Sequence, residues 1–223
     1  MAKSYFSAEL FVFLRQLKRN NRREWFQKNR SRYESLARDP SLRFITDLRF
    51  RLRAISPWLV ADPKPNGGSL FRIYRDIRFS QDKKPYKTHV GMNFWHAASN
   101  EYAHGAGYYL HLEPDGCFLA GGCWHPDPHS LTRIRDAIAW KADEWNAASA
   151  RLELEGDTLT RPPRGYGADH PLIEDLKRKD FIASVDLTEL RVCSPRFMDD
   201  VIAGCEELSP LLRFLSQAVG LQF

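Results

Sequence analysis

The sequence predicts a single α+β domain with a largely antiparallel sheet, an N-terminal helical segment and two closing C-terminal helices. Segments with strand-like patterns lie mainly in the middle of the chain, between helical patterns at both ends. The turn sequence Pro114-Asp115-Gly116 joins two of these segments as an antiparallel hairpin. Strands and helices do not alternate as they do in a Rossmann fold, and the sequence contains no glycine-rich phosphate loop and no internal repeat. These observations favour an α+β fold over an α/β fold.

Three helices are expected in the basic helical part of the chain, residues 1–60. Ser7 is the predicted N-cap of the first helix, which repeats apolar residues three and four apart and stops at Asn20-Asn21. The second helix is expected from Arg22 to Arg38, where Asp39-Pro40 breaks it. The third helix is expected from Ser41 to about Ile55.

The sheet core is expected over about residues 69–125, with one further strand later in the chain. The predicted strands are Ser69 to Tyr74, Thr88 to Trp95, Gly107 to Glu113, Cys117 to Trp124 and Phe181 to Leu187. Within the hairpin, Tyr109, His111 and Glu113 share one face. Gly121-Gly122 indicates a bulge or a close approach of the backbone to another element. Residues 96–105 are polar and form either a lid or a plain surface loop.

The helical remainder begins at Asp127-Pro128, which is typical of an N-cap and a first helical position. This helix is expected to continue to about Ala148, and the segments that flank Gly156-Asp157 can pair with each other. Ser194-Pro195 and Ser209-Pro210 each indicate the start of one closing helix.

Composition places the chain among folded proteins of a reducing compartment. Of its 223 residues, 43% are hydrophobic and 27% are charged, which are ordinary values for a globular domain. The apolar runs are short, so we expect no membrane span. The four cysteines lack paired C-x-x-C spacing and the N-terminus shows no signal sequence. We therefore expect free thiols and a cytoplasmic protein.

Charge is distributed unevenly along the chain. Residues 1–88 contain 21 Lys and Arg against 8 Asp and Glu, whereas residues 89–223 contain 12 against 20. The first part is therefore strongly basic and the second part is acidic. Such asymmetry indicates either a polyanionic partner or attraction between the two parts of one domain.

The most concentrated positive charge lies between Phe71 and Lys87, where three arginines and three lysines face only Asp76 and Asp82. Guanidinium and ammonium groups bind phosphate or carboxylate, and the interleaved aromatic rings suit an anion with an attached ring. The candidate ligand-binding residues here and in the hairpin are Arg72, Arg75, Arg78, Lys84, Tyr86, Lys87, Tyr109 and Trp124. The alternative is an internal network in which Asp76 and Asp82 pair with Arg75 and Lys84 and serve the architecture alone.

His111, Glu113 and Asp76 are the candidate acid–base residues, beside the basic stretch. The sequence shows no nucleophile to complete a catalytic arrangement, so it leaves open whether the protein is an enzyme and indicates no particular cofactor.

Alternate spacing also places Cys123, His125, Asp127 and His129 on one side of an extended segment, where His111 is a further candidate ligand. The prolines between them fit a helix entry equally well, with Asp127 as the cap. We therefore assign no metal site from the sequence.

The basic stretch reads Arg72-x-x-Arg75-Asp76-x-Arg78-Phe79-x-x-Asp82-Lys83-x-Pro85-Tyr86-Lys87. Other short signatures accompany it, namely Asn20-Asn21 with Glu24-Trp25-Phe26, Gly121-Gly122-x-Trp124, Pro163-x-Gly165-Tyr166 and His170-Pro171. In these motifs the chain resembles a widespread family of conserved hypothetical proteins of bacteria and some fungi, classed as a domain of unknown function. The resemblance covers nearly the whole chain and implies one full-length domain. It implies no reaction, cofactor or catalytic residue.

Three hypotheses for function follow from these observations. The first is a protein that binds a phosphate-bearing or otherwise anionic small ligand and is either a binding protein or an enzyme. The second is a nucleic-acid-binding module that uses the basic N-terminal part. The third is a protein-interaction scaffold, which a flat basic face without a pocket would favour.

Overall fold

The computed structural model describes residues 4–99 and 105–223 and has a five-stranded antiparallel sheet at its centre. The strands lie in chain order, and they are β1 (Leu59–Val60), β2 (Val90–His96), β3 (Gly107–Leu112), β4 (Cys117–Cys123) and β5 (Phe181–Leu187). Each strand pairs antiparallel with the next, which confirms the predicted sheet type. The hairpin of β3 and β4 and the strand β5 lie where the sequence predicts them.

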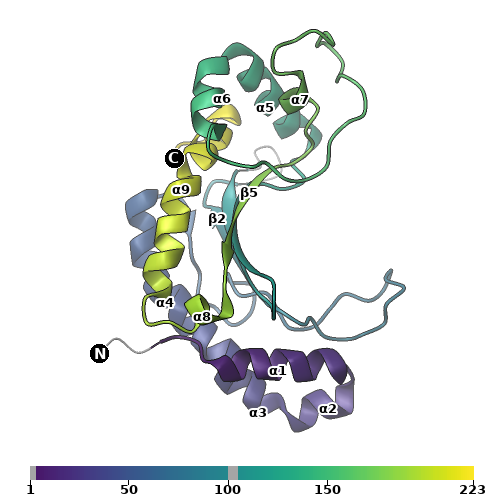
Figure 1. Ribbon diagram of the computed structural model, residues 1–223, viewed down its shortest axis with the longest axis vertical. Coiled ribbons are helices and arrows are strands. Elements are labelled where there is room, and N and C mark those ends of the chain that lie inside the picture. The colour runs from purple at the N-terminus through teal and green to yellow at the C-terminus, as the bar shows by residue number, and fades with distance from the viewer. Residues whose placement is uncertain (1–3, 100–104) are drawn as a thin grey trace.

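Helices form a lobe at each end of the sheet, and Figure 1 shows the two lobes joined by the sheet and a long helix. The N-terminal lobe contains α1 (Ala8–Arg19), α2 (Arg23–Lys28), α3 (Arg30–Tyr33), the π-helical turn η1 (Glu34–Arg38) and α4 (Asp39–Ile55). The other lobe contains α5 (Pro128–Trp140), α6 (Ala142–Ser149) and α7 (Ile173–Leu176). The short helix α8 (Glu189–Val192) leads into α9 (Phe197–Ala218), which contacts β4, α4, α5 and α6. The chain is therefore one α+β unit.

One face of the sheet packs against α9. Alternation along β3 places Tyr108 and Leu110 on this face, where both are fully buried. The Tyr108 hydroxyl donates a 2.7 Å hydrogen bond to the Cys205 carbonyl of α9. A Cβ on Gly121 would lie 2.9 Å from the Leu212 side chain, so this glycine lets β4 approach the helix closely. The predicted close approach at Gly121-Gly122 is thus confirmed.

The closing region is one long helix, so the predicted pair of closing helices is wrong. Pro210 lies inside α9, and Ser209 does not begin a new helix. Proline removes one backbone hydrogen bond. Leu208, Leu211 and Leu212 on either side of it are buried, and this continuous apolar face keeps the two halves in one helix.

The predicted break at Asp39-Pro40 is also wrong. The π-helical turn η1 passes directly into α4, and the helical backbone continues through Pro40 next to this irregular turn. The second predicted helix is instead interrupted at Asn29, between α2 and α3.

Three other segments differ from the sequence predictions. Ser69 to Tyr74 forms isolated bridges rather than a strand, through Leu70 to Met92 and Tyr74 to Tyr86. Glu155 and Thr158 bridge to Ile182 and Arg178 instead of pairing with each other. The single helix predicted up to Ala148 is divided at Lys141 into α5 and α6.

Asp127 caps α5 as predicted, because its carboxylate accepts hydrogen bonds from the backbone N–H groups of His129 and Ser130. The predicted lid or loop at residues 96–105 lies partly outside the described residues, which resume at Gly105. No helix in the described parts of the chain has the length and apolar character needed to cross a bilayer. The four cysteines are free thiols.

Candidate functional site

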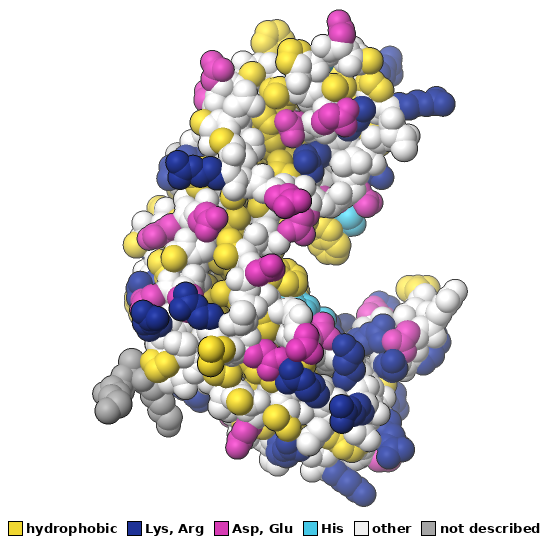
Figure 2. Space-filling view, viewed as in Figure 1, with side chains coloured by type: hydrophobic (Ala, Val, Ile, Leu, Met, Phe, Trp, Pro, Cys, Tyr) yellow, Lys and Arg dark blue, Asp and Glu magenta, His cyan; other side chains and the backbone are white. Residues whose placement is uncertain are grey.

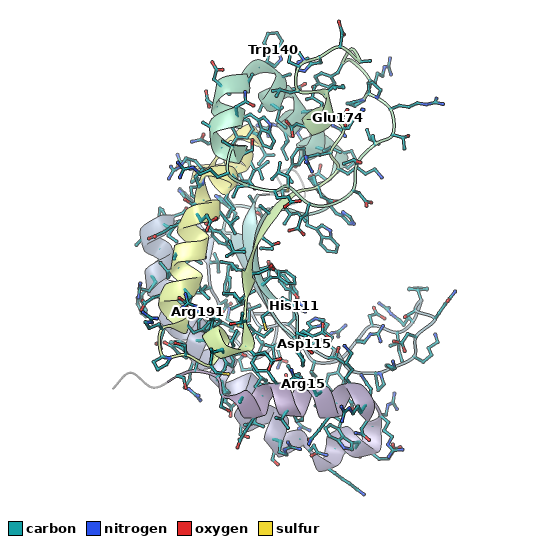
Figure 3. The ribbon with its side chains drawn as sticks, viewed as in Figure 1. Arg15, His111, Asp115, Trp140, Glu174 and Arg191 are labelled. Atoms are coloured by element: carbon teal, nitrogen blue, oxygen red, sulfur yellow. The ribbon has the colours of Figure 1, made fainter. Side chains whose placement is uncertain are left out.

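The sheet face opposite α9 lines an open hollow between the two lobes. Figure 2 shows this hollow from the side, with Lys and Arg side chains gathered on the wall next to the N-terminal lobe and histidine inside it. Side chains alternate along β3, so Tyr109 and His111 lie on this face while Tyr108 is buried on the other. Figure 3 shows His111 on the open face. The predicted shared face of Tyr109, His111 and Glu113 therefore faces the hollow.

A basic arm, defined as residues 71–87, forms part of this wall. Its two legs are held together by backbone hydrogen bonds from Arg75 to Pro85 at 2.9 Å and from Lys87 to Ile73 at 2.8 Å. The arm is anchored where α1 meets α2. The Asn21 side chain donates to the Tyr86 carbonyl at 2.9 Å and accepts from the Tyr86 N–H at 3.1 Å. These contacts bring the predicted Asn20-Asn21 signature against the basic motif.

Aromatic packing supports the same anchor. The Tyr86 ring stacks on Phe26 of α2 with centroids 4.1 Å apart, and Tyr74 packs on Tyr86 at 5.4 Å. Tyr86 is buried, so it positions the arm through its ring and backbone. The base of the arm is consequently fixed to the N-terminal lobe.

Between the arm and the end of α1 lies a cleft of about 440 Å³. Lys18 and Asn21 line it from the N-terminal lobe, and Arg75, Lys84 and Lys87 line it from the arm. Asp76, Asp82, Tyr86, Thr88 and His89 complete its lining. Of the predicted ligand-binding residues, the cleft contains Arg75, Lys84, Tyr86 and Lys87.

The two arginines in the middle of the arm are paired within the arm. Arg75 contacts Asp82 at 2.8 Å, and Arg78 grips Asp76 with two nitrogens at 3.0 and 2.7 Å. The Arg78 side chain and backbone hydrogen bonds lower the pKa of Asp76 to about 2. The Arg75 side-chain hydrogen bond likewise lowers the pKa of Asp82. The local pairing expected from the sequence is present, but its partners are Arg75 with Asp82 and Arg78 with Asp76.

Two lysines of the cleft differ from these arginines. Lys84 and Lys87 have no ion pair with any carboxylate in residues 4–99 or 105–223. The Lys87 ammonium lies 4.8 Å from the centre of the Phe71 ring, and burial together with the nearby Arg72 lowers the pKa of Lys87. Neither ammonium group is therefore held in an ion pair, although the charge of Lys84 contributes to lowering the pKa of Asp82.

Three predicted ligand-binding residues lie away from the cleft. Arg72 is exposed on the arm. Arg78 is held by Asp76. Trp124 is 65% exposed at the far end of β4 and stacks on His125 with centroids 4.4 Å apart. The structure does not bring these side chains together around one ligand.

Tyr109 belongs to an aromatic surface, defined as Phe71, Tyr109, His111 and Phe118, on the open face of the sheet. His111 stacks on Phe118 at 4.8 Å with an angle of 9° between the rings. Tyr109 packs on Phe118 at 6.0 Å and on Phe71 at 5.9 Å. Burial raises the pKa of Tyr109 to about 12, so its hydroxyl stays protonated.

His111 and Glu113 lie beside His89, and we call these three residues the histidine–glutamate cluster. The Tyr109 hydroxyl is 3.0 Å from His111 Nδ1, and His111 Nε2 is 3.3 Å from Glu113 Oε2. The Thr88 hydroxyl donates to Glu113 Oε1 at 2.9 Å, and Lys18 Nζ lies 3.6 Å from the same oxygen. One ligand atom from each member lies within 4.8 Å of the others, which is compatible with a bound metal ion.

Burial sets the protonation of the cluster. It lowers the pKa of His111, and together with the neighbouring His111 it lowers the pKa of His89 to about 4. Burial alone would raise the pKa of Glu113, but hydrogen bonds from Thr88 and His111 outweigh it and the pKa is lowered. At neutral pH the cluster therefore holds two neutral imidazoles and one carboxylate, a set suited to proton transfer or to metal coordination.

Sequence reasoning found His111 and Glu113 but missed His89. The third acid–base candidate, Asp76, is held by Arg78 on the arm and is not part of the cluster. Gly91 pairs with His111 across β2 and β3, and this register brings His89 to the side of Glu113. The signal in the sequence is the alternate position of His89 relative to Gly91 and Asn93, but it identifies a partner only once the strand register is known.

The four alternating residues from Cys123 to His129 do not form a metal-binding cluster among the residues that the structure describes. Cys123 is buried, which raises its pKa to about 12, and Asp127 caps α5. His125 is bound through Nδ1 to the buried Asp180 at 2.7 Å. The spacing of these residues is instead explained by the start of α5, which is the alternative to a metal site that the sequence indicates.

Comparisons with known proteins give one result. No curated protein and no solved structure matches the chain. A family model described as "Conserved hypothetical protein (DUF2461)" matches residues 9–214. That span includes the N-terminal helices, the basic arm, the whole sheet and most of α9. The chain therefore belongs to the DUF2461 family of conserved hypothetical proteins, as the resemblance in its basic motif predicts.

Proposed function

We propose that the protein binds a phosphate-bearing or otherwise anionic small ligand in the cleft between the basic arm and α1. The observation that carries this proposal is that Lys84 and Lys87 line a cleft of about 440 Å³ and form no ion pair with a carboxylate of the described residues. A phosphate or carboxylate group would compensate this charge and accept hydrogen bonds from both side chains.

The arginine–aspartate pairs have a supporting role in this proposal. Arg75 lines the cleft but is bound to Asp82, so it holds the shape of the arm and adds a donor at the rim. Arg78 is bound to Asp76 and exposed, so it stabilises the arm away from the ligand. The anion is therefore assigned to the lysines rather than to the arginines.

The aromatic surface provides a place for the rest of the ligand. His89 lines the cleft and lies with its ring 4.3 Å from His111, which continues into Phe118 and Tyr109. A flat ring attached to the anionic group can lie on this surface by stacking. The ligand class that fits both regions is an aromatic or heterocyclic ring with a phosphate or carboxylate.

The test is a comparison of matched ligands by isothermal titration calorimetry and thermal shift. Nucleoside monophosphates serve as probes, and the corresponding nucleosides and inorganic phosphate serve as controls. Phosphate-bearing probes are expected to raise the melting temperature through preferential binding to the folded state. Replacing Lys84 and Lys87 together by Ala is expected to weaken binding by about tenfold or more, which is the loss of about 1.4 kcal/mol.

The matched control is Lys28→Ala, which removes an exposed lysine of the N-terminal lobe outside the cleft. Its binding and its melting temperature are expected to equal those of the wild type. Equal loss in the control, or no stabilisation by any anionic probe, would contradict the proposal and leave the arm a purely architectural element.

A nucleic-acid-binding function is the second candidate, and one observation favours it. Several arginines of the N-terminal lobe are exposed and form no ion pair with the described residues, namely Arg19, Arg22, Arg23, Arg43, Arg49 and Arg53. Binding through such residues would weaken steeply with salt, because it releases counterions from the phosphate backbone. Fluorescence anisotropy with single- and double-stranded oligonucleotides at several salt concentrations tests this function. Oligonucleotide binding that weakens steeply with salt would support it, and absent or salt-insensitive binding would contradict it.

A further inference from the structure

The geometry points to a divalent transition-metal site formed by His89, His111 and Glu113 at the edge of the cleft. We propose that this cluster binds an ion of the Zn²⁺ class. The site goes beyond the anion-binding proposal, because its ligands do not include the lysines of the cleft.

Distances between the ligand atoms carry the proposal. One ligand atom of each residue lies within 4.8 Å of the other two. His111 Nε2 and Glu113 Oε2 are 3.3 Å apart. Two ligands about 2.0–2.2 Å from a tetrahedral Zn²⁺ lie about 3.3–3.6 Å from each other, so this pair already has the required spacing. The separations that involve His89 are at most 4.8 Å, so they must shorten by no more than about 1.2–1.5 Å for His89 to complete the set.

The chemical nature of the ligands fits the same class of ion. Two imidazoles and one carboxylate are the protein ligands of many catalytic zinc and non-haem iron sites. Hard cations such as Mg²⁺ and Ca²⁺ prefer oxygen ligands, so they are expected to bind more weakly. Both imidazoles are available as neutral ligands at pH 7, since burial lowers the pKa of each.

Hydrogen bonds around the cluster hold its ligand atoms in place. In the metal-bound state the proton of His111 would lie on Nδ1 and be donated to the Tyr109 oxygen, 3.0 Å away, and Nε2, which faces Glu113 in the metal-free protein, would coordinate the ion. Thr88 donates to Glu113 Oε1 at 2.9 Å and leaves Oε2 directed at His111. Phe118 stacks on the His111 ring at 4.8 Å and fixes its plane. Such second contacts are typical of metal ligands, and they distinguish this cluster from a chance meeting of polar side chains.

The surroundings leave a position open toward the cleft. The three protein ligands come from the end of β3 and from the segment just before β2, and His89 and Thr88 also line the cleft. Two positive charges lie near the site, Lys87, whose charge contributes to lowering the pKa of His89, and Lys18, whose ammonium lies 3.6 Å from Glu113 Oε1. Lys18 is the one in contact with a proposed ligand. Its side chain is 63% exposed, so it can move aside when an ion binds. If the anion-binding proposal is also correct, a ligand held by Lys84 and Lys87 would reach the open position of the ion.

The experiment uses the full chain, freed of metal with a chelator, and Zn²⁺ alone as the probe. Calorimetry is expected to show about one Zn²⁺ per chain, and Co²⁺ is expected to give the visible absorption of a four- or five-coordinate site. His89→Ala and Glu113→Gln are each expected to weaken Zn²⁺ binding by about tenfold or more and to abolish the Co²⁺ band. Thr88→Val is expected to weaken binding less, because Thr88 positions Glu113 without coordinating.

The matched controls are His129→Ala and His170→Ala, which remove histidines outside the cluster. Both are expected to bind Zn²⁺ as the wild type does. Urea unfolding without metal checks that each variant folds, and if one does not fold the conclusion rests on the others. Binding that persists in the His89→Ala, Glu113→Gln double variant, or that is lost equally in a control, would overturn the proposal.

The two proposals fail separately. The variant with Ala at both Lys84 and Lys87 is expected to lose the nucleoside monophosphate and keep Zn²⁺. If Zn²⁺ binds to the wild type while no anionic probe does, the metal site stands and the anion-binding proposal is wrong. If the anionic probes bind and Zn²⁺ does not, the reverse holds.

Discussion

Two histidine–carboxylate contacts lie at opposite ends of the open face of the sheet, and they differ in what surrounds them. At the β5 end, Asp180 is 1% exposed and accepts hydrogen bonds from the His125 backbone and ring, both at 2.7 Å, and from the Asp157 N–H at 2.9 Å. At the β3 end, Glu113 is partly exposed and faces two imidazoles beside a cleft. Both oxygens of Asp180 accept backbone hydrogen bonds that hold loops in place, whereas one oxygen of Glu113 faces groups that can coordinate or exchange a proton.

The same residue types thus serve architecture at one end and, in our proposal, metal binding at the other. The difference lies in the partners of the carboxylate, because backbone donors tie a loop and neutral imidazoles do not. A histidine near a carboxylate is therefore weak evidence of a functional site until its other neighbours are known.

The largest loss of stability is expected from adding a side chain at Gly122, where β4 and β5 lie too close together for a Cβ atom. Gly122 has a φ of 139°, and a Cβ there would overlap the Phe181 carbonyl oxygen of β5. Gly122→Ala is expected to lower the free energy of unfolding by about 3–4 kcal/mol, since the backbone conformation and the close approach both exclude a side chain. Urea denaturation measures the change. Gly116→Ala is the control, because a Cβ there meets nothing within 4 Å, and a loss as large in the control would remove the distinction.

Removal of the structural carboxylate comes next. Asp180→Ala is expected to cost about 2 kcal/mol, because it leaves two partly buried N–H groups without their acceptor. Asp180→Asn keeps one acceptor oxygen and is expected to cost less. The measurement is again the free energy of unfolding in urea, and a stable Asp180→Ala protein would show that this contact is not architectural.

Acid is expected to lower the free energy of unfolding through protonation of His89. Its pKa is lowered to about 4 in the folded protein, whereas an unfolded histidine titrates near about 6.5. The unfolded state therefore binds more protons between these values, and the stability that neutral His89 contributes is present above about pH 6.5 and is lost as the pH falls towards 4. Histidine NMR resonances of the metal-free protein are expected to show a midpoint near 4 for His89, and His89→Gln removes this part of the pH dependence. A midpoint near the ordinary value would mean that the ring is open to water.

The smallest effect on stability is expected at Glu113, the carboxylate of the proposed metal site. Glu113→Gln keeps an acceptor for Thr88 and removes a charge from a partly exposed site. We expect a change in the free energy of unfolding of less than about 1 kcal/mol. Urea denaturation of metal-free protein measures it beside Asp180→Ala. If the two variants are equally destabilised, Glu113 is structural as well and the comparison between the two ends fails.

Local signals in the sequence were sufficient for much of the fold. The turn chemistry of Pro114-Asp115-Gly116 predicted the hairpin, and the apolar pattern of Phe181–Leu187 predicted β5. The proline inside α9 misled the prediction, because the helix continues through Pro210 only with the support of side chains buried against the sheet. That support is tertiary and has no local signal.

Only the part of the candidate site that depends on local alternation was predictable from the sequence. Period-two alternation placed Tyr109, His111 and Glu113 on one face. The place of His89 beside them depends on the register between β2 and β3, which are joined by residues 97–106 rather than by a tight turn. The composition of the basic arm was evident, but which aspartate each arginine would bind depends on how the arm folds back at its tip.

The helix α9 contacts the sheet, α4 of the N-terminal lobe and α5 and α6 of the other lobe, as Figure 1 shows. A motion of one lobe relative to the other would therefore have to bend this helix or detach it from one lobe. Its backbone ladder is weakest at Pro210, where one rung is missing, and a helix bends most readily at such a point. Pro210, where the sequence predicted a helix boundary, is thus the position at which α9 is expected to bend most easily.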